Sequence, residues 1–226
     1  MPNWVDQDLF VIGPPSDLER FCERGVTGTF GRARKSWRDE PTFRFDRACP
    51  LCGTEKRLDE HRSAILYRYV RSHTEAYFQL QTSWSYPEHF YLTRLTRDWP
   101  TLQFCCAVNE DMGNFGGVVA GIDGNITDLV SAPNDVRAQR KLVRQLMREW
   151  RRVASRDRPW MVQLPLRYIQ RVQYGVDAVF EDEYANVLYL KSERDVRRLV
   201  RGRKSAVVYG RGARGKWIKA PGLCKR

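Results

Sequence analysis

Two cysteines and a histidine form the strongest local pattern for chemistry in this 226-residue chain. Cys49 and Cys52 lie in the sequence Cys-Pro-Leu-Cys-Gly, and His61 follows after eight intervening residues. Such a tight turn points two thiolates at one ion, and zinc prefers sulfur and nitrogen ligands in a set of four. His73 is the nearest candidate for the fourth ligand. The spacing suggests zinc as a cofactor. The alternative is a pair of reduced cysteines in a surface turn beside a solvated histidine.

Basic side chains form a second pattern, and they gather in the last third of the chain. Residues 134–158 hold nine Lys and Arg against three Asp and Glu, and residues 191–226 hold thirteen against two. The net charge of the whole chain is +12, so the remaining residues are acidic on balance. Segregated positive charge is the electrostatic footprint that a phosphate-rich partner requires. The pattern predicts contact with a polyanion, with nucleic acid as the leading candidate.

Two elements are expected to carry these basic residues. A helix over residues 134–154 would separate an apolar stripe from a basic one, with few acids available for i,i+4 pairing. The tail interleaves glycine, arginine and aromatic residues, a mixture that suits phosphate contact and stacking on unpaired bases. The alternatives are a solvated helix face and a flexible basic tail without a single target. The predicted nucleic-acid contacts are Arg137, Arg140, Lys141, Arg144, Arg148, Arg151, Arg152, Arg198, Arg201, Arg203, Lys204, Arg211, Arg214, Lys216 and Trp217.

Catalytic arrangements are weaker than either pattern. The three histidines do not form the His-x-His spacing of metal-dependent nicking enzymes, and aromatic residues near strands, such as Tyr77 and Tyr91, are more often core than nucleophile. The pair Glu110 and Asp111 beside a glycine-rich turn can hold a cation or act as acid and base. A hairpin with solvated acids is the favoured interpretation. We therefore expect a protein without enzymatic activity.

The elements that position these residues mix strands and helices without a regular repeat. Strands are expected over residues 5–12, 76–82, 101–109, 116–122, 126–130, 185–190 and 205–209, and helices over 16–24, 87–98, 134–154 and 192–202. Ser16 and Glu19 read as a capping box for the first helix, and Ser192 as the cap of the last. Residues 26–75 break the periodicity and are interpreted as an insertion. This order favours a compact α+β sandwich.

Other features limit where the chain resides. The longest apolar runs are far below the roughly 20 residues that a membrane helix needs. The N-terminus lacks the basic segment and apolar core of a secretion signal. We expect a cytoplasmic protein with reduced cysteines and no membrane partner.

Several short motifs follow one another along the chain in the same order as in a known family. Among them are Met1-Pro2-Asn3-Trp4, Leu9-Phe10-Val11-Ile12-Gly13-Pro14, Phe43-Arg44-Phe45-Asp46, Trp84-Ser85-Tyr86-Pro87 and Gly113-Asn114-Phe115-Gly116-Gly117. Over about residues 1–130 the chain resembles plasmid- and phage-borne bacterial proteins with a YubB-type ferredoxin-like domain. The resemblance implies a ferredoxin-like α/β sandwich, a mobile-element origin and a bacterial host cell. It implies no activity and no site, and the cysteine motif and the basic last third have no counterpart in it.

Together these observations predict a ferredoxin-like α/β sandwich with an insertion after the first helix and a basic C-terminal extension. Its domains would be a core over residues 1–133, with the insertion at 26–75, and an extension over 134–226 packed on that core. The predicted function is non-enzymatic binding of the nucleic-acid phosphate backbone in a phage or plasmid context. The alternatives are a protein-interaction factor, such as an inhibitor of a host defence complex or a ribonucleoprotein subunit, and a nuclease.

Overall fold

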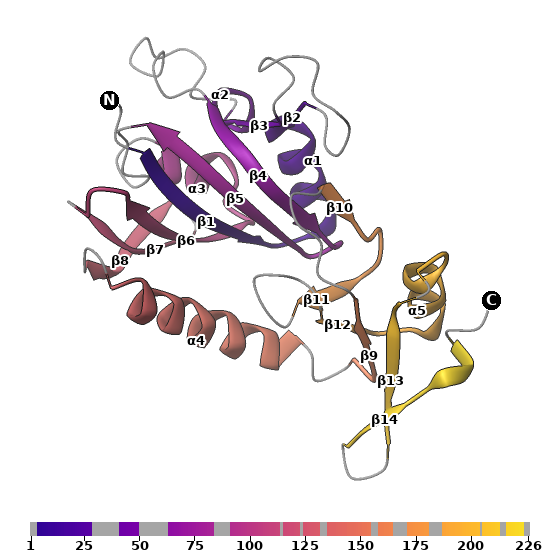
Figure 1. Ribbon diagram of the computed structural model, residues 1–226. Helices are drawn as coiled ribbons and strands as arrows, with labels where there is room; N and C mark the ends of the chain where they lie inside the picture. Colours follow the sequence, from indigo (N-terminus) through magenta and orange to yellow (C-terminus); the bar gives the residue numbers. More distant parts are fainter. Residues whose placement is uncertain are drawn as a thin grey trace.

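The computed structural model of the chain contains two β-sheets joined by a common core (Figure 1). It describes residues 4–28, 41–49, 63–83, 91–113, 115–122, 124–131, 135–154, 158–164, 171–180, 187–203, 205–212 and 216–223. None of the helices within these ranges is long and apolar enough to cross a membrane.

The first sheet has nine strands in the described part of the chain. They are β1 (Trp4–Ile12), β2 (Val26–Thr27), β3 (Thr42–Arg44), β4 (Ser63–Arg71), β5 (Glu75–Ser83), β6 (Gln103–Glu110), β7 (Gly116–Ile122), β8 (Asn125–Ser131) and β10 (Arg171–Gln173). Eight follow the antiparallel order β2-β3-β4-β5-β1-β6-β7-β8, and β10 pairs in parallel with the end of β4. Because neighbouring strands twist relative to one another, a sheet of this width curls.

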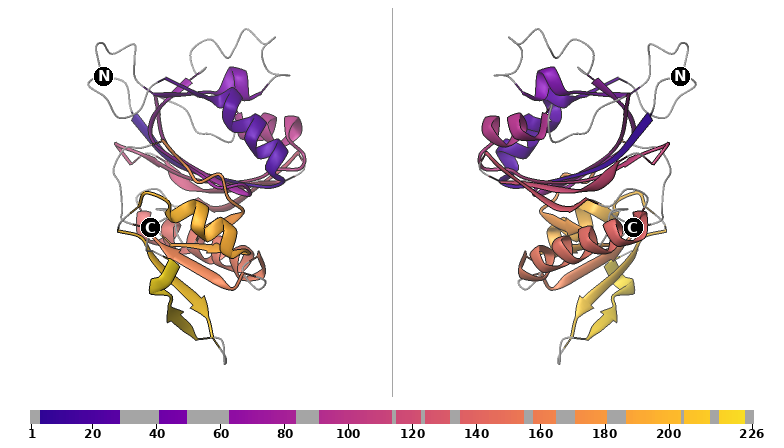
Figure 2. Two further views of the ribbon diagram at one scale, coloured as in Figure 1. Left: turned by 90° about the vertical axis from the view of Figure 1, so that its right-hand side faces the viewer. Right: turned by 90° about the vertical axis from the view of Figure 1, so that its left-hand side faces the viewer.

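Three helices fill the concave side of the curled sheet (Figure 2). They are α1 (Pro15–Gly25), α2 (Phe45–Ala48) and α3 (Thr93–Asp98). The ring of Phe21 on α1 lies at the centre, with the rings of Phe43, Phe78, Trp99 and Phe104 at centroid distances of 5.5, 5.9, 5.8 and 5.6 Å. The contacts of Phe21 with Phe78, Trp99 and Phe104 are edge-to-face, an arrangement that adds to the stabilisation from burial. The concave side is therefore a closed aromatic core.

The central strand β1 is buried on both faces. Its residues Val5, Leu9 and Val11 belong to the concave core, whereas Phe10 and Ile12 belong to a second core on the convex side. Side chains alternate between the two faces of a strand, so one strand serves both cores. This arrangement connects the packing of the two halves of the chain.

The second sheet lies under the convex face of the first (Figure 2). In the described part of the chain it has five antiparallel strands in the order β11-β12-β9-β13-β14. The strands are β9 (Trp160–Gln163), β11 (Ala178–Phe180), β12 (Val187–Leu190), β13 (Val207–Arg211) and β14 (Trp217–Lys219). The helices α4 (Val136–Ala154) and α5 (Glu193–Val200) accompany it, and a short 3₁₀ helix over Pro221–Leu223 follows β14. We call residues 4–131 the first region and residues 135–223 the second.

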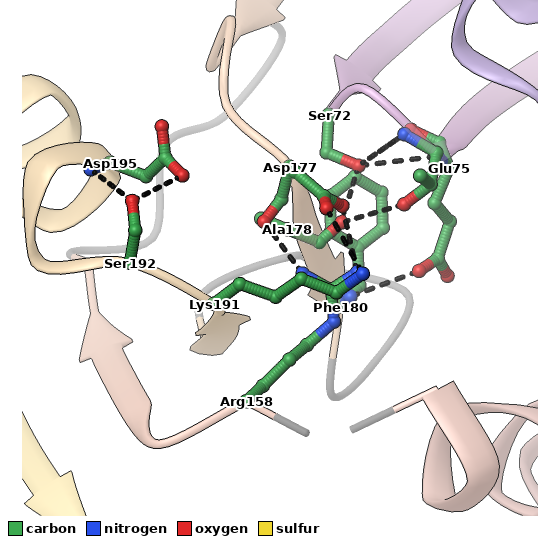
Figure 3. A network of polar contacts seen from close by, with 10 residues as sticks. Ser72, Glu75, Arg158, Asp177, Ala178, Phe180, Lys191, Ser192 and Asp195 are labelled. Atoms are coloured by element: carbon green, nitrogen blue, oxygen red, sulfur yellow. Dashed lines mark hydrogen bonds and ion pairs between the residues drawn. The ribbon is translucent and has the colours of Figure 1, made fainter. Parts of the chain in front are cut away.

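A polar network fixes the turn between β4 and β5 to β11 (Figure 3). The Ser72 hydroxyl donates to the carbonyl of Ala178 at 2.6 Å, and the fully buried Glu75 accepts from the backbone N–H of Phe180 at 2.9 Å. Farther out, the buried guanidinium of Arg158 donates to the Asp177 carbonyl and carboxylate, both at 2.7 Å. Buried polar groups cost free energy unless they are paired, so the Ser72 and Glu75 contacts hold the two regions in one arrangement, and the Arg158 contacts fix Asp177 within the second region.

The prediction of a ferredoxin-like α/β sandwich is wrong. The fold is mainly antiparallel β, with a nine-stranded sheet and a second sheet of five strands in the described residues. The strands β1, β5 and β6, with α1 and α3 on one face, correspond to the mixed order of strands and helices that suggested a sandwich. Additional strands widen that sheet until it curls, and a second sheet covers the opposite face. Local periodicity predicted several of these strands, but it could not reveal how they pair into the two sheets.

Some expected elements also differ. The capping box at Ser16 and Glu19 does not form, because Pro14 occupies the N-cap without a side-chain hydrogen bond and Glu19 pairs with Arg71 instead. Residues 26–75, which we expected to form an insertion, contribute β2, β3 and β4 to the first sheet. The predicted domain boundary at residues 133 and 134 lies outside the described residues.

Candidate nucleic-acid interface

Helix α4 presents its basic residues as one exposed stripe. The stripe consists of Arg137, Arg140, Lys141, Arg144 and Arg148, all of them exposed, and we call it the α4 stripe. Positions separated by three, four, seven and eleven residues fall on one side of an α-helix. Over 13 residues, from Val136 to Arg148, the sequence contains no acid. The stripe therefore concentrates five positive charges on about three turns of helix.

Packing on the opposite side sets the direction of the α4 stripe. Val143 and Met147, one turn apart, are buried in the convex core, where α4 contacts β6 and β7. The start of the helix is capped by Asp135, whose Oδ1 accepts from the N–H of Ala138 at 2.8 Å. The preceding residue, Asn134, lies outside the described residues. Burial of the apolar side leaves the cations facing solvent, as the periodicity predicted.

The surroundings of the α4 stripe are open and positive. Its five members line a depression of about 750 Å³. Arg140 and Arg144 also line a smaller cavity with Asp8 and Tyr77 on the first sheet, so these two lie near a carboxylate. Like charges spaced one turn apart repel each other, and a polyanion seated in the depression would relieve that repulsion.

A second candidate surface lies on the outer face of the second sheet. The strand register places Tyr189, Met161, Tyr209 and Lys219 in one row across four strands. The adjacent positions on β12, β9 and β13 are Leu188, Val162 and Val208. All three side chains are buried in the convex core. Because side chains alternate, the row faces away from that core.

The aromatic residues on this face are joined by direct contacts. The Trp217 ring on β14 lies 5.7 Å from the Tyr189 ring, and the Arg211 guanidinium lies 5.7 Å from the Trp217 ring. The hairpin of β13 and β14 extends away from the first sheet (Figure 2). We call Tyr189, Tyr209, Arg211, Lys216, Trp217 and Lys219 the hairpin surface. The sequence pattern missed Tyr189, because only the strand order brings β12 near the tail.

Two of the remaining predicted contacts, Arg198 and Arg203, have their printed neighbours elsewhere in the second region. Arg203 donates from Nη1 to the Leu199 carbonyl at the end of α5, and its guanidinium lies 5.9 Å from the Tyr174 ring. Arg198 lies against Gly175 on a different part of the second region. The others are Arg201, which is exposed, Lys204 and Arg214, which lie outside the described residues, and Arg151 and Arg152, whose side chains are likewise not described.

The predicted zinc ligands are only partly described. Cys49 is 1% exposed within the concave core, whereas His73 is exposed where the β4–β5 turn meets the second region. These two residues are not brought together, and Cys52 and His61 lie outside the described residues. No group of three His, Cys, Asp or Glu side chains suited to a metal occurs within the described ranges. Zinc binding stays a prediction from the cysteine spacing.

Three of the four nominated catalytic groups are buried. The Tyr77 hydroxyl donates to Asp8 at 2.6 Å, and the Tyr91 hydroxyl donates to Gln7. Burial raises the pKa of the Tyr91 phenol well above its usual value, and the neighbouring thiols of Cys106 and Cys49 raise it further. Such a phenol stays protonated in the core and is not an activated nucleophile. Glu110 is 4% exposed rather than solvated, and only Asp111 faces water as expected.

Comparison of the chain with protein-family models, curated proteins and solved structures found no match. The resemblance to proteins with a YubB-type domain therefore stays a prediction, and the surfaces have to be interpreted from their own chemistry.

Proposed function

We propose that this chain binds nucleic acid through the phosphate backbone, without catalysing a reaction on it. The α4 stripe carries the proposal, because five exposed cations without an acid among them are held on one rigid helix. Arginine offers a planar fork of donors that matches phosphate oxygens. The phage or plasmid setting and the bacterial cytoplasm rest on the sequence resemblance alone.

The hairpin surface adds a different kind of contact. Half-buried aromatic rings next to exposed arginine and lysine are suited to unpaired bases, which stack on a ring whatever their sequence. Base stacking on an aromatic side chain is worth about 1–3 kcal/mol per base. Neither phosphate contact nor base stacking needs base-specific hydrogen bonds. Binding of single strands with little sequence preference is therefore expected.

Charge reversal on the α4 stripe tests the proposal. The variant changes Arg137, Lys141 and Arg148 to glutamate, and leaves Arg140 and Arg144 near Asp8 untouched. Affinity for labelled single- and double-stranded oligonucleotides is measured across a salt series. If each of the three cations meets one phosphate, the slope of log K against log salt on duplex DNA should fall in magnitude by about 2.7.

A matched control separates a binding surface from a change in net charge. Arg24, Arg47 and Arg97 are exposed on the three helices of the first region, and their reversal changes the net charge by the same amount. This control should keep most of the affinity and the salt slope. Equal losses in both variants, or no binding by the unchanged protein at low salt, would overturn the proposal. The second of these outcomes would favour the protein-interaction alternative.

A further inference from the structure

A small pocket lies where the two regions meet, and none of its lining residues belongs to the α4 stripe or the hairpin surface. Its volume is about 170 Å³. Its walls come from the start of α1, the β4–β5 turn, the segment between β10 and β11, and α5. The lining residues that bear on its chemistry are Glu19, Arg71, His73, Gly175 and Arg198.

Arg71 supplies a half-buried guanidinium whose hydrogen bonds are incompletely satisfied. Its side chain is 14% exposed, and Nη2 donates to Glu19 Oε1 at 3.2 Å. Its Nη1 is buried and has no hydrogen-bond partner in the described part of the chain. A charged donor removed from water without an acceptor is costly. Because Nη1 has almost no accessible surface, a ligand meets it only if the Arg71 side chain turns, and an oxygen acceptor brought by that ligand would then satisfy it.

Arg198 brings a second guanidinium to the same pocket. A Cβ added at Gly175 would lie 3.6 Å from Arg198 Nη2, so the guanidinium rests against this glycine. Gly175 has a φ of +59°, a conformation that other residues rarely adopt. The adjacent Arg197 is paired with Glu193 at 2.5 Å, whereas the ion pairs among the described residues do not include Arg198. Arg198 thus adds positive charge that no carboxylate there neutralises.

The backbone around His73 is fixed by the second region. The His73 N–H donates to the Val176 carbonyl at 2.9 Å, and the preceding Ser72 hydroxyl is bound to Ala178. The His73 side chain is exposed beside Arg71. A site whose parts are held before a ligand arrives loses less free energy to ordering when it binds.

We infer that this pocket binds a phosphate group. Two guanidinium groups face one carboxylate, which leaves a net positive charge for an anion with several acceptor oxygens. The start of α1 at Pro15 lies in the same wall, and the positive end of a helix dipole adds to that field. The pocket is smaller than the roughly 300–1,000 Å³ of typical sites for larger ligands, which suits a single phosphate group.

The phosphate group has two chemical sources, inorganic phosphate and the terminal phosphate of a nucleic-acid strand. The inference goes beyond the proposed interface, because it involves neither the α4 stripe nor the hairpin surface. Titration of inorganic phosphate into the full-length protein by calorimetry tests it directly. Arg198→Gln should weaken the affinity about tenfold by removing a charge-assisted contact, and Arg71→Gln should weaken it at least as much.

Arg194→Gln is the matched control, since Arg194 is another exposed arginine of α5 and does not line the pocket. It should bind phosphate like the unchanged protein. Absence of saturable binding up to about 10 mM phosphate, or equal affinity in Arg198→Gln, would overturn the inference. Arg198 is exposed, so this variant decides the matter even if Arg71→Gln does not fold.

Two further arms identify the source and separate the two proposals. Tighter binding of a 5′-phosphorylated oligonucleotide than of its 5′-hydroxyl counterpart, lost in Arg198→Gln, would assign the pocket to a strand end. Equal binding of both oligonucleotides, with inorganic phosphate still bound, would assign it to the free ion. The α4 charge-reversal variant should keep its affinity for inorganic phosphate, so either proposal can fail while the other stands.

Discussion

The two regions of the molecule bury their cores in different ways. The first region closes its concave core with its own helices, and every member of that core comes from residues 5–126. The second region buries only the inner face of its sheet, in a core that combines Phe10, Tyr77 and Val118 of the first region with its own residues. The first core is therefore complete without the second region, whereas the second core is not complete without the first.

This one-sided dependence explains how the second region can carry so much positive charge. Concentrated like charge destabilises a compact structure through self-repulsion. Burial against the convex face of the first sheet offsets that cost, and it leaves α4 and the outer face of the second sheet free to present cations. The dependence predicts that damage to the first core affects both regions, while damage to the second stays local.

Phe78→Ala should have the largest effect. The Phe78 ring is fully buried and lies 5.1 Å from the Phe43 ring and 5.0 Å from the Tyr69 ring. Loss of such a ring costs about 3–5 kcal/mol through lost burial and the cavity left behind. Hydrogen exchange followed by mass spectrometry should show faster exchange in strands of both sheets, with unfolding at lower urea concentration.

Leu188→Ala is the counterpart in the second core. Leu188 on β12 is fully buried, and its truncation is expected to cost about 2–5 kcal/mol of local stability. Faster exchange should be confined to the second region, while β5 and α1 keep their protection. Equal loosening of the first core in this variant would contradict the one-sided dependence.

Glu75→Ala should weaken the junction rather than either core. The carboxylate of Glu75 is fully buried and accepts from the Phe180 N–H, which would lose its acceptor. An unsatisfied buried donor costs about 1–3 kcal/mol. Urea unfolding gives the total loss, and exchange of the Phe180 amide reports its location. Glu75→Gln keeps an acceptor oxygen and should retain more stability than the alanine variant, and the reverse order would argue against this role.

The sequence predicted the elements whose pattern is local. Alternation predicted β1, and helical spacing predicted the buried and basic sides of α4. The Ser192 cap of α5 is confirmed, since its hydroxyl accepts from the Asp195 N–H at 3.1 Å. In each case the signal lies within one element, so no knowledge of its neighbours was needed.

Features that depend on distant pairing were missed. Strand β4 was overlooked because its pairing with β5 shifts register between Leu66 and Arg68, and the bulge breaks the two-residue alternation. The contact of Tyr189 with Trp217 depends on the order of four strands. The pocket at Arg71 and Arg198 likewise joins segments far apart in the chain. Such convergence is a property of the topology and leaves no trace in local spacing.

Asp6→Asn should give the smallest effect, and it probes charge in the first region. Partial burial raises the pKa of Asp6, a hydrogen bond from Gln81 opposes that rise, and nearby Asp111 adds to it. A carboxyl whose pKa is higher in the folded state than in the unfolded state favours folding at low pH. That advantage is lost as pH rises through the raised pKa. The asparagine variant should therefore be more stable at pH 7, by about 0.5 kcal/mol or less because Asp6 is exposed to solvent screening. Its advantage should shrink as pH falls toward 4.

Urea unfolding at both pH values measures the stability difference between Asp6→Asn and the unchanged protein, with Asp111→Asn as the control that should give part of the same gain. An asparagine variant that is less stable at pH 7 would show that charge crowding at this edge does not limit the first region.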